Sequence, residues 1–179
     1  HGSLPIGNHL YELSRNENGV HSLHGGFENA SFRIWELCSA SVTPSGNAQV
    51  SFTCNLPDGL DGFPGNRRIT VTYTLTESHQ LTMDYEAVSD QDTYFNISNH
   101  SYFNLSGDFS RTATDHLLQI NADRYICNSP DFIPEGTAGV ADTPFDFRQP
   151  VSLLDQLQKY PEDIQIRRNQ GYNHGFLLN

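Results

Sequence analysis

Arg68-Ile69-Thr70-Val71-Thr72-Tyr73-Thr74-Leu75-Thr76 is the stretch that decides the fold of this chain. Apolar side chains alternate in it with threonines, and a period of two is the period of a β-strand. After a polar turn at residues 77–80, apolar residues alternate again from Leu81 to Ala87. Two alternating runs joined by a short polar turn predict an antiparallel hairpin with one apolar face.

Shorter β-like segments lie on both sides of this hairpin. Further strands are predicted at residues 32–41, 49–55, 94–105 and 116–126. One short helix is predicted after Ser152, with Leu153, Leu154 and Leu157 on one face, and it ends before Pro161. Repeated short strands separated by turn residues predict an all-β protein, either a β-sandwich or a large twisted antiparallel sheet. Because no linker or internal repeat divides the chain, we predict a single domain over residues 1–179.

Composition narrows the classes of partner. The 179 residues include 10 Lys and Arg against 21 Asp and Glu, a net charge of −11. Nucleic acids and anionic membranes need a basic surface, so we expect neither as a partner. No apolar run reaches the length of a membrane span, and no charged-then-apolar leader opens the sequence. An acidic protein of this size is compatible with a neutral ligand such as a sugar.

The cysteines indicate a compartment. Cys38, Cys54 and Cys127 are odd in number, widely spaced and without a CxxC pair. A disulfide framework is therefore not expected, and free thiols in a reducing cytosol are the simplest interpretation. We predict a cytoplasmic location.

Residues 99–105, Asn-His-Ser-Tyr-Phe-Asn-Leu, place one histidine among side chains that hydrogen-bond and stack. If the segment is a strand, His100, Tyr102 and Asn104 share one face, while its other face can be buried. That face would offer an imidazole, a phenol and an amide to a polar ligand. The alternative is that His100 is a hydrogen-bonded core histidine.

Other polar segments have a functional and a structural interpretation. In residues 21–26, His24 precedes two glycines, which let a ligand approach closely, and an ordinary loop is the alternative. A metal site is not expected there, because no further ligands accompany His21 and His24. Residues 58–65 alternate acids and glycines but lack the late Glu of a calcium loop, so a tight connection is predicted. In residues 143–148 we expect a packed corner, with Asp146 and Arg148 paired or exposed.

Five short segments of the chain occur in the order found in the aldose 1-epimerase (galactose mutarotase) family, which the chain resembles from about Leu10 to its C-terminus. The matching segments are residues 23–26 for the family's LHGG, 62–65 for GFPG, 99–105 for NHxYFNL, 139–148 for VxxTPFDFR and 171–174 for GYDH.

The resemblance implies an antiparallel β-sandwich of the mutarotase-like supersandwich type, which interconverts the α and β anomers of free sugars such as galactose and glucose without cofactor or metal. His100 matches the acid that protonates the ring oxygen, and His24 matches a histidine that hydrogen-bonds the sugar. Ser101 and Tyr102 lie in the substrate-contacting stretch. Asn173 stands where the family has a substrate-binding Asp; an amide still hydrogen-bonds hydroxyls but carries no charge.

The resemblance also implies missing parts. The family's Arg-bearing motif lies upstream of the first residue of this chain, and its Glu base lies beyond residues 171–174. We therefore expect an incomplete sandwich, truncated at both ends relative to the family, that has little or no activity by itself. Glu135 and Asp142 are conceivable replacements for the base, but no pattern supports either.

Two other functions stay open. One is a non-catalytic carbohydrate-binding β module that uses the same surface, and the other is a fragment without activity. Missing strands would expose sheet edges and apolar faces, so a homodimer that covers those edges is a further expectation.

Overall fold

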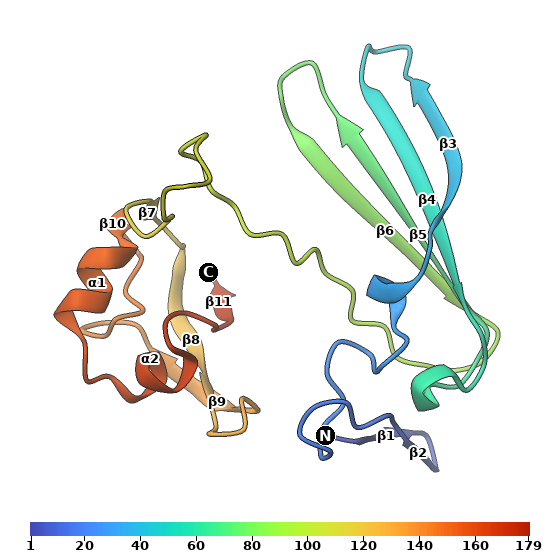
Figure 1. The fold of residues 1–179 in the computed structure, drawn as a ribbon, viewed down its shortest axis with the longest axis horizontal. Coiled ribbons are helices and arrows are strands. Elements are labelled where there is room, and N and C mark those ends of the chain that lie inside the picture. The colour runs from blue at the N-terminus through green and yellow to red at the C-terminus, as the bar shows by residue number, and fades with distance from the viewer. The chain divides into compact units, whose positions relative to one another are not determined.

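The computed structural model describes all of residues 1–179, which form two compact units, residues 1–99 and 100–179 (Figure 1). Each unit has its own core and is described by itself. The antiparallel β architecture predicted from the sequence is confirmed, because every strand pair in both units is antiparallel. The assignment of the whole chain to one domain stays a prediction.

The first unit consists of a small hairpin and a larger meander sheet. Its elements are β1 (Ser3–Ile6), β2 (His9–Glu12), the 3-10 helix η1 (Ala30–Phe32), β3 (Glu36–Val42), β4 (Ala48–Leu56), the 3-10 helix η2 (Leu60–Gly62), β5 (Arg67–Leu75) and β6 (Leu81–Ser89). Strands β1 and β2 pair with each other, and the larger sheet has the order β3-β4-β5-β6 (Figure 1).

The predicted hairpin is confirmed as β5 and β6, which pair in one register from Arg67 opposite Ser89 to Leu75 opposite Leu81. The threonines of β5 lie on the face of the sheet opposite its apolar residues, and their hydroxyls hydrogen-bond to side chains of β4. Thr72 Oγ1 is 2.7 Å from Ser51 Oγ, and Thr74 Oγ1 accepts from Gln49 Nε2 at 3.1 Å. Such cross-strand pairs hold the two strands in register.

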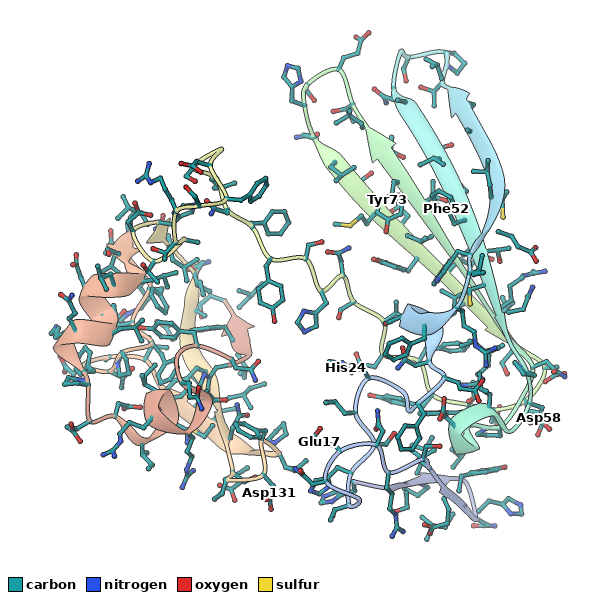
Figure 2. The ribbon with its side chains drawn as sticks, in the orientation of Figure 1. Glu17, His24, Phe52, Asp58, Tyr73 and Asp131 are labelled. Atoms are coloured by element: carbon teal, nitrogen blue, oxygen red, sulfur yellow. The ribbon has the colours of Figure 1, made fainter.

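The apolar face of this sheet is covered only at one end. There, buried Cys54, Leu56 and Ile69 pack with Trp35 and Phe95. Figure 2 shows Phe52 and Tyr73 farther along β4 and β5, beyond this core.

At the opposite end, one row of aligned residues crosses all four strands. The row is Val42, Ala48, Leu75 and Leu81. Leu75 is 51% exposed and Leu81 is 57% exposed. An apolar row this exposed is a surface on which other apolar groups can pack.

The second unit packs two short sheets and two helices. Its elements are β7 (Leu117–Leu118), β8 (Ala122–Asn128), β9 (Pro134–Gly139), β10 (Val151–Ser152), α1 (Leu153–Lys159), α2 (Ile164–Asn169) and β11 (Phe176–Leu178). The sheets have the orders β11-β8-β9 and β10-β7. Neither α-helix has the length and apolar character that crossing a membrane requires.

The predicted corner at residues 143–148 is the core of this unit. Phe145 is fully buried and stacks on Tyr125, with ring centroids 4.0 Å apart. Arg148 donates two hydrogen bonds to Asp146, from Nε to Oδ1 at 2.9 Å and from Nη2 to Oδ2 at 2.8 Å, so the predicted pair is confirmed. The same bonds hold the pKa of the Asp146 carboxyl below its usual value.

The helix predicted after Ser152 is confirmed, and its N-cap Ser152 Oγ accepts the Asp155 N–H at 3.3 Å. Helix α2 was not predicted. Its cap is Asp163, whose carboxylate accepts from the N–H groups of Gln165 and Ile166.

Three strand predictions need correction. Residues 32–41 start as η1, which Asn29 caps, and β3 begins only at Glu36. Residues 116–126 are divided between β7 and β8. The strand predicted at residues 94–105 is wrong, because no strand of the chain pairs with this segment and an unpaired run cannot form a ladder.

We predict that Phe145→Ala lowers the free energy of unfolding by about 3–5 kcal/mol, since it opens a cavity in a closed core. Urea unfolding followed by far-UV circular dichroism measures the change. The matched control is Phe109→Ala at a side chain that is 90% exposed, where we expect a change within about 0.5 kcal/mol. Equal effects of the two substitutions would contradict this account of the core.

Candidate functional site

His24 lies in the first unit, on a loop just before η1 (Figure 2). Three consecutive residues have positive φ: His24 at 54°, Gly25 at 89° and Gly26 at 104°. Glycine adopts such angles at little cost, so the predicted glycine turn is confirmed. Gly26 is also required for space, because a Cβ there would collide with the side chain of Asp61. The His24 side chain itself is exposed.

Asn16 holds this loop from one side. Its Oδ1 accepts the Leu23 N–H at 2.7 Å. Its Nδ2 donates to the carbonyls of Leu23 at 2.9 Å and Gly26 at 3.1 Å. One side chain therefore satisfies three main-chain groups that flank His24, as a paired strand would.

Asp61 holds the loop from the other side. Its Oδ1 accepts the Phe27 N–H at 2.8 Å, and its Oδ2 accepts the Glu28 N–H at 2.9 Å. Bonds to a carboxylate are stronger than neutral ones, so this is a firm anchor. Asp61 is held in turn, because its own carbonyl accepts the Ser14 N–H at 3.0 Å. Neither Asn16 nor Asp61 is predicted from the sequence as a support of the site. The available signal for Asp61 is its position as an acid in the turn-rich segment 58–65.

His100, Ser101 and Tyr102 open the second unit in an irregular segment. The predicted proximity of two rings is found without a strand: the His100 and Tyr102 ring centroids are 5.2 Å apart. All three residues are exposed, and Tyr102 is 89% exposed. The alternative of a core histidine at position 100 is therefore wrong.

Asn104 does not join this group, which corrects the expectation of a shared strand face. Its Nδ2 donates to the Arg111 carbonyl at 2.9 Å, and its Oδ1 accepts from the N–H and Oγ of Ser106. The amide is used to build the turn that follows. The next N–H, of Leu105, donates to His116 Nε2 at 2.8 Å, so that turn is anchored as well.

Asn173 lies in the connection between α2 and β11, and its side chain is exposed. Its backbone is held on both sides: the N–H donates to His174 Nδ1 at 3.2 Å, and the carbonyl accepts from Asn128 Nδ2 at 3.0 Å. Just before it, the Tyr172 hydroxyl donates to the Pro144 carbonyl at 2.9 Å. Burial raises the pKa of that hydroxyl, so it stays a donor.

The five predicted site residues are thus divided between the units. His24 lies in the first, and His100, Ser101, Tyr102 and Asn173 lie in the second. No group of three or more His, Cys, Asp or Glu side chains is arranged to hold a metal ion. What the described side chains offer is hydrogen bonding, aromatic contact and an imidazole for proton transfer.

A family model described as aldose 1-epimerase matches residues 1–179. The chain is 38% identical over 161 residues to the aldose 1-epimerase of Escherichia coli (strain K12), covering 89% of this chain and 44% of that protein. It is 38% identical over 178 residues to the galactose mutarotase of Mus musculus, covering 99% and 48%.

Among solved structures, the crystal structure of galactose 1-epimerase from Lactobacillus acidophilus NCFM is similar with a TM-score of 0.89 at 36% identity, over 99% of this chain and 51% of that one. The GalM/aldose epimerase homologue from C. elegans has a TM-score of 0.82 at 30% identity. The chain spans about half the length of the relatives it matches.

We predict that Asp61→Asn loosens the loop that carries His24. The amide keeps one acceptor but turns an NH2 group toward one of the two N–H groups that the carboxylate accepts. Loss of a charged hydrogen bond should speed exchange of the Phe27 or Glu28 amide by about tenfold or more.

Hydrogen-exchange NMR measures this change, and Asp84→Asn on the exposed surface of β6 is the control. Unchanged protection of both amides in Asp61→Asn would show that the carboxylate does not anchor the loop.

Proposed function

The chain belongs to the aldose 1-epimerase family, and we propose that it carries the sugar site and the acid of an aldose 1-epimerase that interconverts the α and β anomers of free hexoses. Galactose and glucose are the substrates we expect. The observation that supports this most is the presence of His24 and His100 on one chain, in segments that resemble the family's motifs, together with the family match along residues 1–179.

The proposed reaction is general acid–base ring opening. A base takes the proton of the C1 hydroxyl while His100, as imidazolium, gives a proton to the ring oxygen. The bond between C1 and the ring oxygen breaks, and C1 becomes an aldehyde. Rotation about C1–C2 and closure on the other face give the other anomer, and both protons return. The histidine side chain suits this role because an imidazole can gain and lose a proton near neutral pH.

The local geometry supports separate roles for the two histidines. His24 is exposed on a loop that Asn16 and Asp61 fix, as a residue that orients a sugar hydroxyl should be. His100 is exposed beside the Tyr102 ring at 5.2 Å, and an aromatic ring can pack on the apolar face of a pyranose. Ser101 and Asn173 would add hydrogen bonds to hydroxyls.

A second candidate function is a carbohydrate-binding module without catalysis. The uncharged Asn173 favours it, because an amide binds hydroxyls but is a weaker acceptor than the carboxylate that the family motif has there. This candidate predicts saturable galactose binding that depends on His24 and Tyr102, with no change in the rate of anomer exchange.

The three cysteines of the chain are free thiols, Cys38 on the surface, Cys54 in the core and Cys127 between them in exposure. Free thiols fit a reducing compartment, which supports a cytoplasmic location.

We predict that the chain binds galactose and accelerates its mutarotation only when a base is supplied, because the matching motifs assign an acid but no base to these residues. Polarimetry of α-galactose should show little acceleration in a carboxylate-free buffer and a more than additive gain when formate is added. His100→Ala should reduce that gain by a factor of about 10² or more, since acid groups contribute typically 10²–10⁴-fold.

His9→Ala, at an exposed histidine of β2, is the matched control and should keep the full gain. A gain that survives His100→Ala would refute the assignment of the acid. Galactose binding without any gain would favour the binding module, and the absence of binding would contradict both functions.

We also predict self-association through the exposed apolar row of the β3–β6 sheet, as a homodimer. Leu75→Lys should shift the chain toward monomer in sedimentation velocity, because it places a charge in the apolar row. Thr74→Lys, on the opposite face of the same strand, should leave association unchanged. A chain that is monomeric throughout, or equal effects of the two substitutions, would disprove this.

A further inference from the structure

His174 determines how the backbone of Asn173 is held. The Asn173 N–H donates to His174 Nδ1, and a backbone N–H can only donate. Nδ1 must therefore act as an acceptor and carry no proton. A neutral imidazole has one N–H, so the proton lies on Nε2.

Gln165 accepts the hydrogen bond that the Nε2–H group of His174 donates. His174 Nε2 is 3.1 Å from Gln165 Oε1 and 3.3 Å from Asn169 Nδ2. Asn169 Nδ2 donates to the Gln165 carbonyl at 2.7 Å, and because a protonated Nε2 cannot accept, the oxygen of Gln165 is its partner. The Gln165 side chain is buried in α2 with 7% exposure, and its orientation is fixed by Asn128. Its Oε1 accepts the Asn128 N–H at 2.9 Å, while its Nε2 donates to the Asn128 carbonyl at 3.1 Å. A flipped amide would place its NH2 group against two N–H donors, so the acceptor must face His174.

The imidazole ring is held in place by packing as well. It lies edge-on to Phe145 with centroids 4.4 Å apart, and edge-on to Tyr125 at 6.0 Å. The hydrogen bonds thus run from Gln165 through His174 to the backbone of Asn173, and we call this series of contacts the relay. Asn173 is the only exposed residue of the three, and its side chain is left to meet a ligand.

We propose that Gln165 and His174 are positioning residues for Asn173, and that a second proton on His174 releases Asn173 and weakens sugar binding. The inference rests on the proposed function only in assigning Asn173 to sugar contact. Protonated Nδ1 becomes a donor that faces the Asn173 N–H, so one hydrogen bond is lost and two donors oppose each other.

The groups around His174 determine the pH at which the ring takes up its second proton. Burial lowers the pKa of His174, and Asp163 at the start of α2 partly opposes this. The other titratable groups packed around this site are Tyr125, Tyr172, Cys127 and Arg168, whose Nη1 donates to the Asn128 carbonyl at 3.0 Å. The folded pKa is below the ordinary value of 6.5, so the neutral ring's contribution to stability is complete above about pH 6.5. It is lost as pH falls through the folded pKa.

The first test reads the tautomer directly. Long-range 1H–15N NMR of the full chain at pH 7 should show a protonated Nε2 and an unprotonated Nδ1 in His174. A proton on Nδ1 at this pH would overturn the proposal without reference to any sugar.

The second test perturbs the relay through Gln165→Glu. A carboxylate still accepts from His174, but its negative charge favours the imidazolium, and the donor to the Asn128 carbonyl is lost. The His174 titration midpoint should move to higher pH, and the Asn173 amide signal should shift over that same raised range.

Gln156→Glu is the matched control for this substitution, because Gln156 is equally buried in α1 and donates to a backbone carbonyl, that of Asp146, at 3.1 Å. Both variants lose one such bond, but only Gln165 contacts His174. A His174 titration that moves equally in both variants, or in neither, would refute the relay.

The third test measures galactose affinity by NMR titration at pH 7 and at a pH below the His174 midpoint found in the first titrations. In the unsubstituted chain the affinity should fall at the lower pH by about fivefold, the value of one hydrogen bond. In Gln165→Glu the same loss should set in at a higher pH than in the unsubstituted chain. His174→Asn can place an amide oxygen where Nδ1 lies, so it should restore the affinity that His174→Ala loses and make it independent of pH.

These outcomes separate the two proposals. If the chain binds no galactose at either pH while the tautomer and the Gln165→Glu shift are as expected, the proposed function fails and the relay stands. If galactose binds with equal affinity in all variants and at both pH values, Asn173 is not positioned for the sugar and this inference is wrong.

Discussion

Main-chain N–H and C=O groups that leave water must find partners, and this requirement shapes both units of the chain. In the β3–β6 sheet the neighbouring strand supplies the partners. In the segments that carry the site residues, side chains supply them instead. Asn16 and Asp61 serve the loop of His24, and Gln165 serves Asn128 as a strand edge would. Irregular segments can therefore hold functional side chains in fixed positions without belonging to a sheet.

Two histidines show how the same requirement selects a protonation state. His116 accepts the Leu105 N–H at Nε2 and directs Nδ1 toward the Asp115 carboxylate, so its proton lies on Nδ1. His174 has the opposite tautomer, because its Nδ1 accepts from Asn173 and its Nε2 faces an amide oxygen. In each ring the nitrogen that accepts a backbone N–H is the unprotonated one, and the partner of the other nitrogen differs. The hydrogen bond from His116 lowers the pKa of the Asp115 carboxyl.

Local patterns were sufficient for elements whose partners are close in sequence. The alternation around Val71 and the polar turn that follows it predicted β5 and β6, and the cap at Ser152 predicted α1. The same alternation was misleading at residues 94–105, because a pattern does not report whether a neighbouring strand exists. The motifs located the site residues singly, but their supports lie far away in sequence. Asp61 is 34 residues from Phe27, and Gln165 is 37 residues from Asn128, so only the folded chain shows these pairs.

The contact between Gly26 and Asp61 has a consequence for how such a chain changes over generations. The two positions share one volume, because any β-carbon at residue 26 would occupy the space of the Asp61 carboxyl. A larger residue at 26 is accessible only after position 61 has become smaller, and that first step removes the anchor of two amides. Neither order of substitution passes through an undamaged intermediate. We therefore expect positions 26 and 61 either to change together or to stay unchanged, so that Asp61 and the glycine turn are inherited as a pair.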